Sequence, residues 1–268
     1  MSDGRKALTA GLVLGGAILL FSLAGPFVYP FSPYAIHPAH ALQGPSLLFP
    51  LGTDELGRNG LALLMAGGRA TLAVALPAAM LAFVTGVAYG LLAGLGPGWL
   101  DKILMRLLDV VLALPGLVVL IFFAALVTLN NASLVLLLGL LSWPALARLV
   151  RNEAVAQRGR DFILAARQAG AGWFYLARVH VLRIIAPVLV VNATFLVGDT
   201  IFSLSALSFL GLGVQPPQVS WGSLVQNALN IIVLSPWWLI VPPGLMIFGS
   251  LLAASLIGRG LVRRGELP

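Results

Sequence analysis

Residues 148–183 read RLVRNEAVAQRGRDFILAARQAGAGWFYLARVHVLR and separate two strongly hydrophobic runs. This segment holds seven of the sixteen Lys and Arg residues, which indicates a cytoplasmic loop, because positive charge resists translocation across a membrane. Within the loop, Asp161 is expected to cap a short helix and Gly170 to end it. One face of that helix is predicted to carry Phe162, Ala165, Ala166 and Ala169. The sequence therefore predicts a helix-turn-helix on the inner side of a membrane bundle, where a soluble partner can bind it.

The composition is typical of an integral membrane protein. Of the 268 residues, 59% are hydrophobic and only 9% are charged, whereas soluble domains carry about 25% charged residues. The net charge of +7 would suggest a nucleic-acid partner in a soluble protein. In a membrane protein the loop charges explain it, so we expect contact with membrane lipid and no nucleic acid. The chain has no cysteine, which excludes disulfides and thiolate metal ligands.

The hydrophobic runs predict an all-α protein with six transmembrane helices. The runs cover about 8–29, 70–94, 103–128, 132–149, 184–212 and 236–258. The first run could imitate a signal peptide, but it is longer than the about 7–15 apolar residues of such a peptide, so we expect a retained helix. The Pro-rich segment from Pro30 to Arg69 is predicted to be an ordered extramembrane loop. We divide the chain into the first helix with this loop (1–69), a core transmembrane domain (70–262) and a tail (263–268).

The distribution of positive charge predicts the orientation. With both termini in the cytoplasm, fourteen of the sixteen basic residues lie inside, and only Arg58 and Arg69 lie outside. The inverse orientation would place most of the charge outside, against the positive-inside rule. Trp221, Trp237 and Trp238 are interpreted as anchors at a membrane boundary.

Two series of helical glycines recur every four residues. They are Gly11 with Gly15, and Gly86 with Gly90 and Gly94. Small residues at this spacing let transmembrane helices approach closely. We interpret both series as packing within the chain rather than as a motif for dimerisation.

Two acids lie in or near the hydrocarbon region. Asp109 follows Arg106 by three residues, so the two are expected to pair on one helix face. Asp199 lies near the middle of the fifth predicted helix, where an ionisable group marks an aqueous path or a buried ion pair. We expect Asp199 to face a translocation cavity, with a buried partner on a neighbouring helix as the alternative. Asn192 and Ser203 are further candidates for the pathway.

The sequence shows no catalytic constellation. The H-E-x-x-H, G-x-S-x-G and G-x-x-x-x-G-K-[ST] patterns are all missing. His37 and His40 lie in the predicted outer loop and His180 lies at the opposite membrane face, so the three histidines are not expected to share a metal site. We therefore expect no enzyme, no metal and no cofactor in this chain. A role that consumes energy would need a nucleotide-binding partner on another chain.

Three stretches resemble the permease subunits of ATP-binding-cassette importers of the dipeptide, oligopeptide and nickel class. Residues 51–58 (LGTDELGR) are similar to the motif LGTDxLGRD of that family, with Asn59 in place of its final Asp. Residues 207–217 (LSFLGLGVQPP) and 220–222 (SWG) match the signature LSFLGLGxxPP…SWG. Residues 105–115 (MRLLDVVLALP) resemble MRxxDxxLALP. Each stretch alone is weak, but together they are specific.

The resemblance implies that the cytoplasmic loop carries a coupling helix, at about 161–177, that docks into a cleft of an ATPase subunit. Leu164, Ala165 and Ala166 correspond to the EAA motif of the family, so Leu164 replaces its glutamate. The alternative is a basic helix flanked by aromatic residues that lies on anionic lipid headgroups. The residues assigned to ATPase coupling are Asp161, Phe162, Leu164, Ala165, Ala166, Gly170 and Ala171.

The resemblance also implies a type I importer permease in the inner membrane of a prokaryote, which moves di- or oligopeptides by alternating access. The implied partners are a homologous second permease, two ATP-binding subunits that hold ATP and Mg, and an extracytoplasmic solute-binding protein. This chain would be the C-type member of the permease pair. The residues assigned to binding-protein docking are Asp54, Arg58, Gln215 and Trp221. The alternatives are import of nickel or a metal chelate by the same machinery and, more remotely, a secondary transporter or channel that works without ATP.

Overall fold

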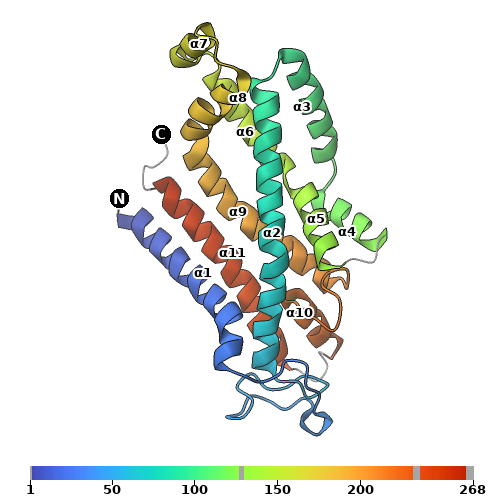
Figure 1. Ribbon diagram of the computed structural model, residues 1–268. Helices are drawn as coiled ribbons and strands as arrows, with labels where there is room; N and C mark the ends of the chain where they lie inside the picture. Colours follow the sequence, from blue (N-terminus) through green and yellow to red (C-terminus); the bar gives the residue numbers. More distant parts are fainter. Residues whose placement is uncertain (1, 127–129, 232–235, 264–268) are drawn as a thin grey trace.

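The computed structural model describes residues 2–126, 130–231 and 236–263 of the chain. Every regular element in these ranges is a helix (Figure 1). The elements in chain order are α1 (Ser2–Val28), η1 (Pro38–His40), α2 (Gly60–Leu95), α3 (Gly98–Leu112), α4 (Gly116–Leu126), α5 (Asn131–Ser142), α6 (Pro144–Gln157), α7 (Asp161–Gln168), α8 (Trp173–Tyr175), the π-helix η2 (Leu176–Val181), α9 (Leu182–Phe209), α10 (Trp221–Asn230) and α11 (Trp237–Arg263).

The predicted all-α membrane bundle is confirmed, but two of its spans are bent. Four helices are long and apolar enough to cross a membrane, and the pairs α3–α4 and α5–α6 bring the total to six when each pair counts as one span. The bends measure 78° and 41°. The first break ends at Pro115 and the second lies just before Pro144, because proline has no N–H and clashes with the preceding helical turn. The prediction that 103–128 and 132–149 are each one continuous helix is therefore wrong.

The second span begins ten residues earlier than expected. The predicted loop reaches Arg69, but α2 starts at Gly60, where the Asn59 side chain accepts hydrogen bonds from the backbone N–H groups of Leu61 and Ala62 at 3.0 and 3.1 Å. An asparagine at this position satisfies N–H groups that have no partner inside the helix. The extramembrane loop is therefore limited to the segment between α1 and Asn59, at the bottom of Figure 1.

The sequence did not predict α10, which follows the LSFLGLG segment. Ser220 caps it, and the side chains of Ser220 and Ser223 bond the backbone reciprocally. Trp221 begins this helix and is completely buried, and its indole N–H donates to the carbonyl oxygen of Leu64 at 3.1 Å. The prediction that Trp221 anchors the chain at a membrane boundary is therefore wrong. Trp237, by contrast, is exposed.

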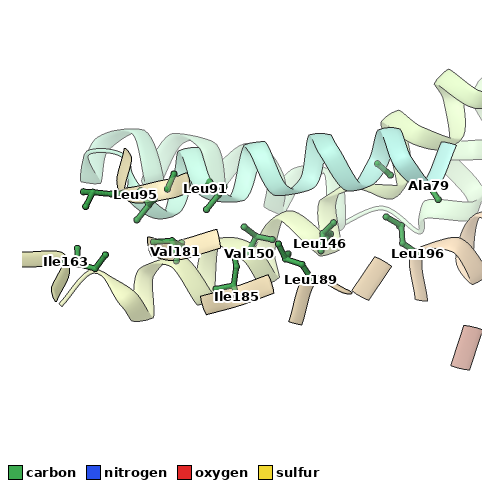
Figure 2. Packing of buried hydrophobic residues seen from close by; sticks show 14 residues of the cluster. Ala79, Leu91, Leu95, Leu146, Val150, Ile163, Val181, Ile185, Leu189 and Leu196 are labelled. Carbon is green, nitrogen blue, oxygen red and sulfur yellow. The ribbon is translucent and has the colours of Figure 1, made fainter. Parts of the chain in front are cut away.

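The glycine series pack helices of this chain together, as predicted. A Cβ added to Gly90 would lie 2.6 Å from the carbonyl oxygen of Ala147, and one added to Gly94 would lie 2.5 Å from Ala154. The backbone of α2 therefore lies directly on α6. In the same way, a Cβ on Gly11 would lie 2.8 Å from a backbone nitrogen of α11. Figure 2 shows the adjoining core, in which leucines of α2 face side chains of α6 and α9.

Candidate functional site

The short helix α7 lies at one end of the molecule, at the top of Figure 1, opposite the loop that follows α1. It begins after Arg160, whose side chain makes no capping bond, and Asp161 is its first helical residue. The expected cap by Asp161 is therefore wrong. A carboxylate in the first turn still interacts favourably with the positive end of the helix dipole.

Gly170 ends the helix as predicted. Its φ is +86°, a conformation that residues with a Cβ rarely adopt. The N–H of Gly170 bonds the carbonyl oxygen of Arg167 at 3.0 Å, and the N–H of Ala171 bonds that of Ala166 at 2.9 Å. This pair of bonds is a Schellman motif, which reverses the chain and satisfies the last carbonyl groups. The predicted helix over 161–177 is consequently two segments, α7 and the start of the fifth span at Trp173.

The two sides of α7 differ in burial. Ile163 is completely buried, and Ala166 packs against the same cluster of apolar side chains. Phe162, Leu164 and Ala165 are exposed. Ala166 shares one helix face with Phe162 and Ala165 by its spacing, as predicted, but it lies at the edge of that face and packs against the core. We define the outer surface of α7 as Phe162, Leu164, Ala165 and Gln168. No other part of the described chain covers these four exposed residues, so another molecule can bind them.

Ile163 places α7 on the main buried cluster of the bundle. It belongs to one buried cluster with Leu95 of α2, Val150 of α6 and Ile185 of α9 (Figure 2). Burial of an isoleucine side chain contributes about 1.5–3 kcal/mol. One side of α7 is therefore part of the same core as α2, α6 and α9.

Arg158 makes a second connection next to α7. Its guanidinium donates to the carbonyl oxygens of Ala93 and Gly96, at 3.3 and 2.6 Å. Ala93 belongs to the last turn of α2, whose carbonyls lack partners inside the helix and attract positive charge. The residue that leads from α6 into α7 is thus bonded to the C-terminal end of α2.

Two ion pairs join α3 to α6. Arg151 donates to both carboxylate oxygens of Asp101, at 2.9 and 2.6 Å, and Arg148 donates to Asp109 at 2.5 Å. Asp109 thus pairs across helices, and the expected pair with Arg106 is wrong. Arg148 and Arg151 of the basic loop therefore have structural roles. No signal in the sequence indicated these partners, because the paired residues are 39 and 50 positions apart.

The pathway candidates lie on α9 but do not form one surface. Asp199 is exposed and lines an open cleft of about 360 Å³ between α9 and α11. The amide of Asn192 donates to the carbonyl oxygen of Val188 in its own helix, at 2.9 Å. Ser203 is buried and does not line the cleft. Of the three, only Asp199 therefore combines a polar group with open space.

Two of the residues assigned to binding-protein docking stabilise the outer loop instead. Asp54 accepts hydrogen bonds from the N–H groups of Leu56 and Arg58 at 3.0 and 2.8 Å, and from the Arg58 guanidinium at 2.7 Å. Both charged side chains are largely buried. Trp221 is completely buried, so its assignment to a docking surface is wrong. Gln215 is exposed on the segment between α9 and α10, where another protein can reach it.

Comparison with known proteins covers most of the chain. Residues 86–265 match the family described as binding-protein-dependent transport system inner membrane component. The chain is 37% identical over 263 residues to the di/tripeptide transport system permease protein DppC of Pseudomonas aeruginosa, which covers 96% of this chain and 86% of the relative. It is 33% identical over 257 residues to the dipeptide transport system permease protein DppC of Bacillus subtilis, with coverage of 96% and 80%. The glutathione transport system permease protein GsiD of Pectobacterium atrosepticum is 37% identical over 220 residues, with coverage of 82% and 72%.

Proposed function

This chain belongs to the family of binding-protein-dependent transport system inner membrane components, and from that membership we propose that it imports di- or oligopeptides across the cytoplasmic membrane, driven by ATP. The relatives whose names state a substrate support peptides over nickel or a metal chelate. The chain itself is a transport permease, and ATP would be hydrolysed with Mg on separate subunits. The observation that carries the proposal is the exposed outer surface of α7, whose opposite side contributes Ile163 to the buried cluster shared by α2, α6 and α9.

The geometry supports alternating access driven from the cytoplasmic side. Two ATP-binding subunits approach each other when they bind ATP, and one of them binds the outer surface of α7. Since Ile163 belongs to the buried cluster that α2, α6 and α9 share, and Arg158 bonds the end of α2, movement of α7 would displace these helices together. Packed helices move between discrete arrangements, which opens the pathway to one side at a time. A homologous second permease would supply the other half of the pathway, and a solute-binding protein would deliver the peptide to the outer face.

Reconstitution tests this proposal directly. The chain is purified with its second permease and ATP-binding subunits and placed in proteoliposomes, with a loaded solute-binding protein outside and ATP inside. We expect uptake of a radiolabelled dipeptide that requires both ATP and the binding protein. Uptake at the same rate without ATP would instead assign the chain to secondary transporters or channels.

The proposed orientation has both termini in the cytoplasm and can be tested with single cysteines, because the chain has none of its own. Leu47 lies fully exposed in the outer loop, and Gly159 has open space around its α-carbon beside α7. A membrane-impermeant maleimide is expected to label Leu47→Cys in intact spheroplasts and to label Gly159→Cys only after lysis. The reverse pattern would invert the orientation.

A further inference from the structure

We propose that Asp199, Phe195 and Phe202 form a site for an organic ammonium group, and hence for the amino terminus of a transported peptide. The three side chains line the cleft of about 360 Å³ between α9 and α11. This inference rests on the proposed function and adds the chemical group that the permease recognises.

The position of Asp199 along α9 places the site inside the membrane. Asp199 lies sixteen residues beyond Arg183, the last basic residue before the apolar part of the helix. At 1.5 Å per residue this separation is about 24 Å, within a hydrocarbon core about 30 Å thick. A carboxylate at this depth is costly unless a cation or water accompanies it, and such residues commonly mark a substrate path.

None of the described residues supplies a cation for this carboxylate. Among the described residues, the ion pairs are Arg58–Asp54, Arg148–Asp109 and Arg151–Asp101, and Asp199 takes part in no side-chain hydrogen bond. The rest of the cleft is lined by Phe195, Gly198, Phe202, Leu251, Ala254 and Ser255, none of which carries charge. Asp199 is therefore open to a cation from another molecule that enters this cleft.

The neighbouring residues favour an ammonium over a metal ion. Phe195 and Phe202 are four residues before and three residues after Asp199, so all three share one face of α9. Aromatic faces attract organic cations, and carboxylates bond ammonium N–H groups. A bare divalent metal would need several oxygen, nitrogen or sulfur ligands. In the described part of the chain, no three His, Cys, Asp or Glu residues are grouped to hold one.

Small residues on the two helices make room for the ligand. A Cβ added to Gly198 would lie 3.3 Å from the Cβ of Ala254, so α9 and α11 are in close contact at the floor of the cleft. The ring of Phe195 lies against Gly258 of α11, where a Cβ would be only 2.8 Å away. Because Gly258 has no side chain, the ring of Phe195 can pack directly against α11. Unmodified peptides carry a positive amino terminus at neutral pH, because the pKa of an α-amino group is about 7.7–8.0.

The test compares Asp199→Asn, which removes the charge, with Asp199→Glu, which retains it. Each variant is reconstituted as the complete transporter with its binding protein, and uptake of L-alanyl-L-alanine is measured together with ATP hydrolysis. We expect the Asn variant to lose uptake about tenfold or more, since a hydrogen bond to a charged group is lost, and the Glu variant to retain most of it. A lower uptake per ATP hydrolysed by the Asn variant than by the Glu variant is the expected sign of a lost substrate contact.

Tetramethylammonium chloride serves as a direct probe of the site, with potassium chloride as the matched salt control. At millimolar concentration it is expected to inhibit dipeptide uptake by the wild type and the Glu variant, and to leave the residual uptake of the Asn variant unchanged. Three results would overturn the ammonium site: wild-type uptake by Asp199→Asn, equal losses in the Asn and Glu variants, or loss of the second permease from the purified Asn complex. Absence of any ATP-dependent dipeptide uptake by the wild type would instead overturn the proposed function.

Discussion

Replacing Ala165 with glutamate is expected to abolish ATP-dependent transport while the membrane bundle stays folded. Ala165 is exposed on the outer surface of α7, whereas the helix is held by Ile163 on the opposite side. A glutamate adds charge and bulk to a surface that a partner would have to cover, and desolvating an unpaired charge costs several kcal/mol. The ATP-binding subunits should therefore no longer co-purify with the permease.

The matched control is Ala156→Glu, the same change at another exposed alanine, on α6. It is expected to leave both the co-purification and the transport close to wild type. Pull-down of the ATP-binding subunits and dipeptide uptake are measured for both variants, with size-exclusion chromatography to verify folding. If the Ala165 variant retains its ATP-binding subunits and transports at the wild-type rate, α7 is not the coupling helix.

Replacing Gly90 with leucine is expected to separate α2 from α6 and to destabilise the fold. A Cβ at Gly90 would already lie 2.6 Å from both the carbonyl oxygen of Ala147 and the Cβ of Val150. Neither neighbour can move away without shifting a helix. Overpacking of this kind typically costs about 1–3 kcal/mol. The melting temperature of the detergent-solubilised chain should fall by roughly 2–12 °C, given about 2–4 °C per kcal/mol at this chain length.

Gly16→Leu is the matched control, because a Cβ added to Gly16 of α1 would meet no atom within 4 Å. Its melting temperature should stay near that of the wild type. Thermal unfolding followed by tryptophan fluorescence compares the two variants in the same detergent. Equal shifts would show that the close contact between α2 and α6 does not limit stability.

Local signals in the sequence predicted several features correctly. The end of α7 at Gly170 was predictable, because only the backbone conformation of that residue is involved. The packing role of Gly86, Gly90 and Gly94 was also predictable, because a spacing of four places them on one helix face in any surroundings. The start of α2 could have been found as well, since Asn59 is a good helix cap. That signal lies ten residues before Arg69, the charged residue that precedes the apolar run at 70–94.

Features that depend on distant residues were not predictable. Asp109 pairs with Arg148 rather than with Arg106, because α6 packs beside α3 and brings a second guanidinium within reach. Trp221 is buried because α10 folds back against α2, where Leu64 accepts its N–H. The inward direction of Ala166 likewise follows from the position of the core to which Ile163 belongs.

The sequence by itself determined the membrane class, the set of apolar segments and the location of the basic loop, because hydrophobicity, charge and backbone conformation act over a few neighbouring residues. Only the tertiary structure decided which side of α7 is exposed, which charges are paired and which polar group, Asp199, borders an open cleft. Those properties depend on helices that lie far apart in the chain and are brought together by close packing.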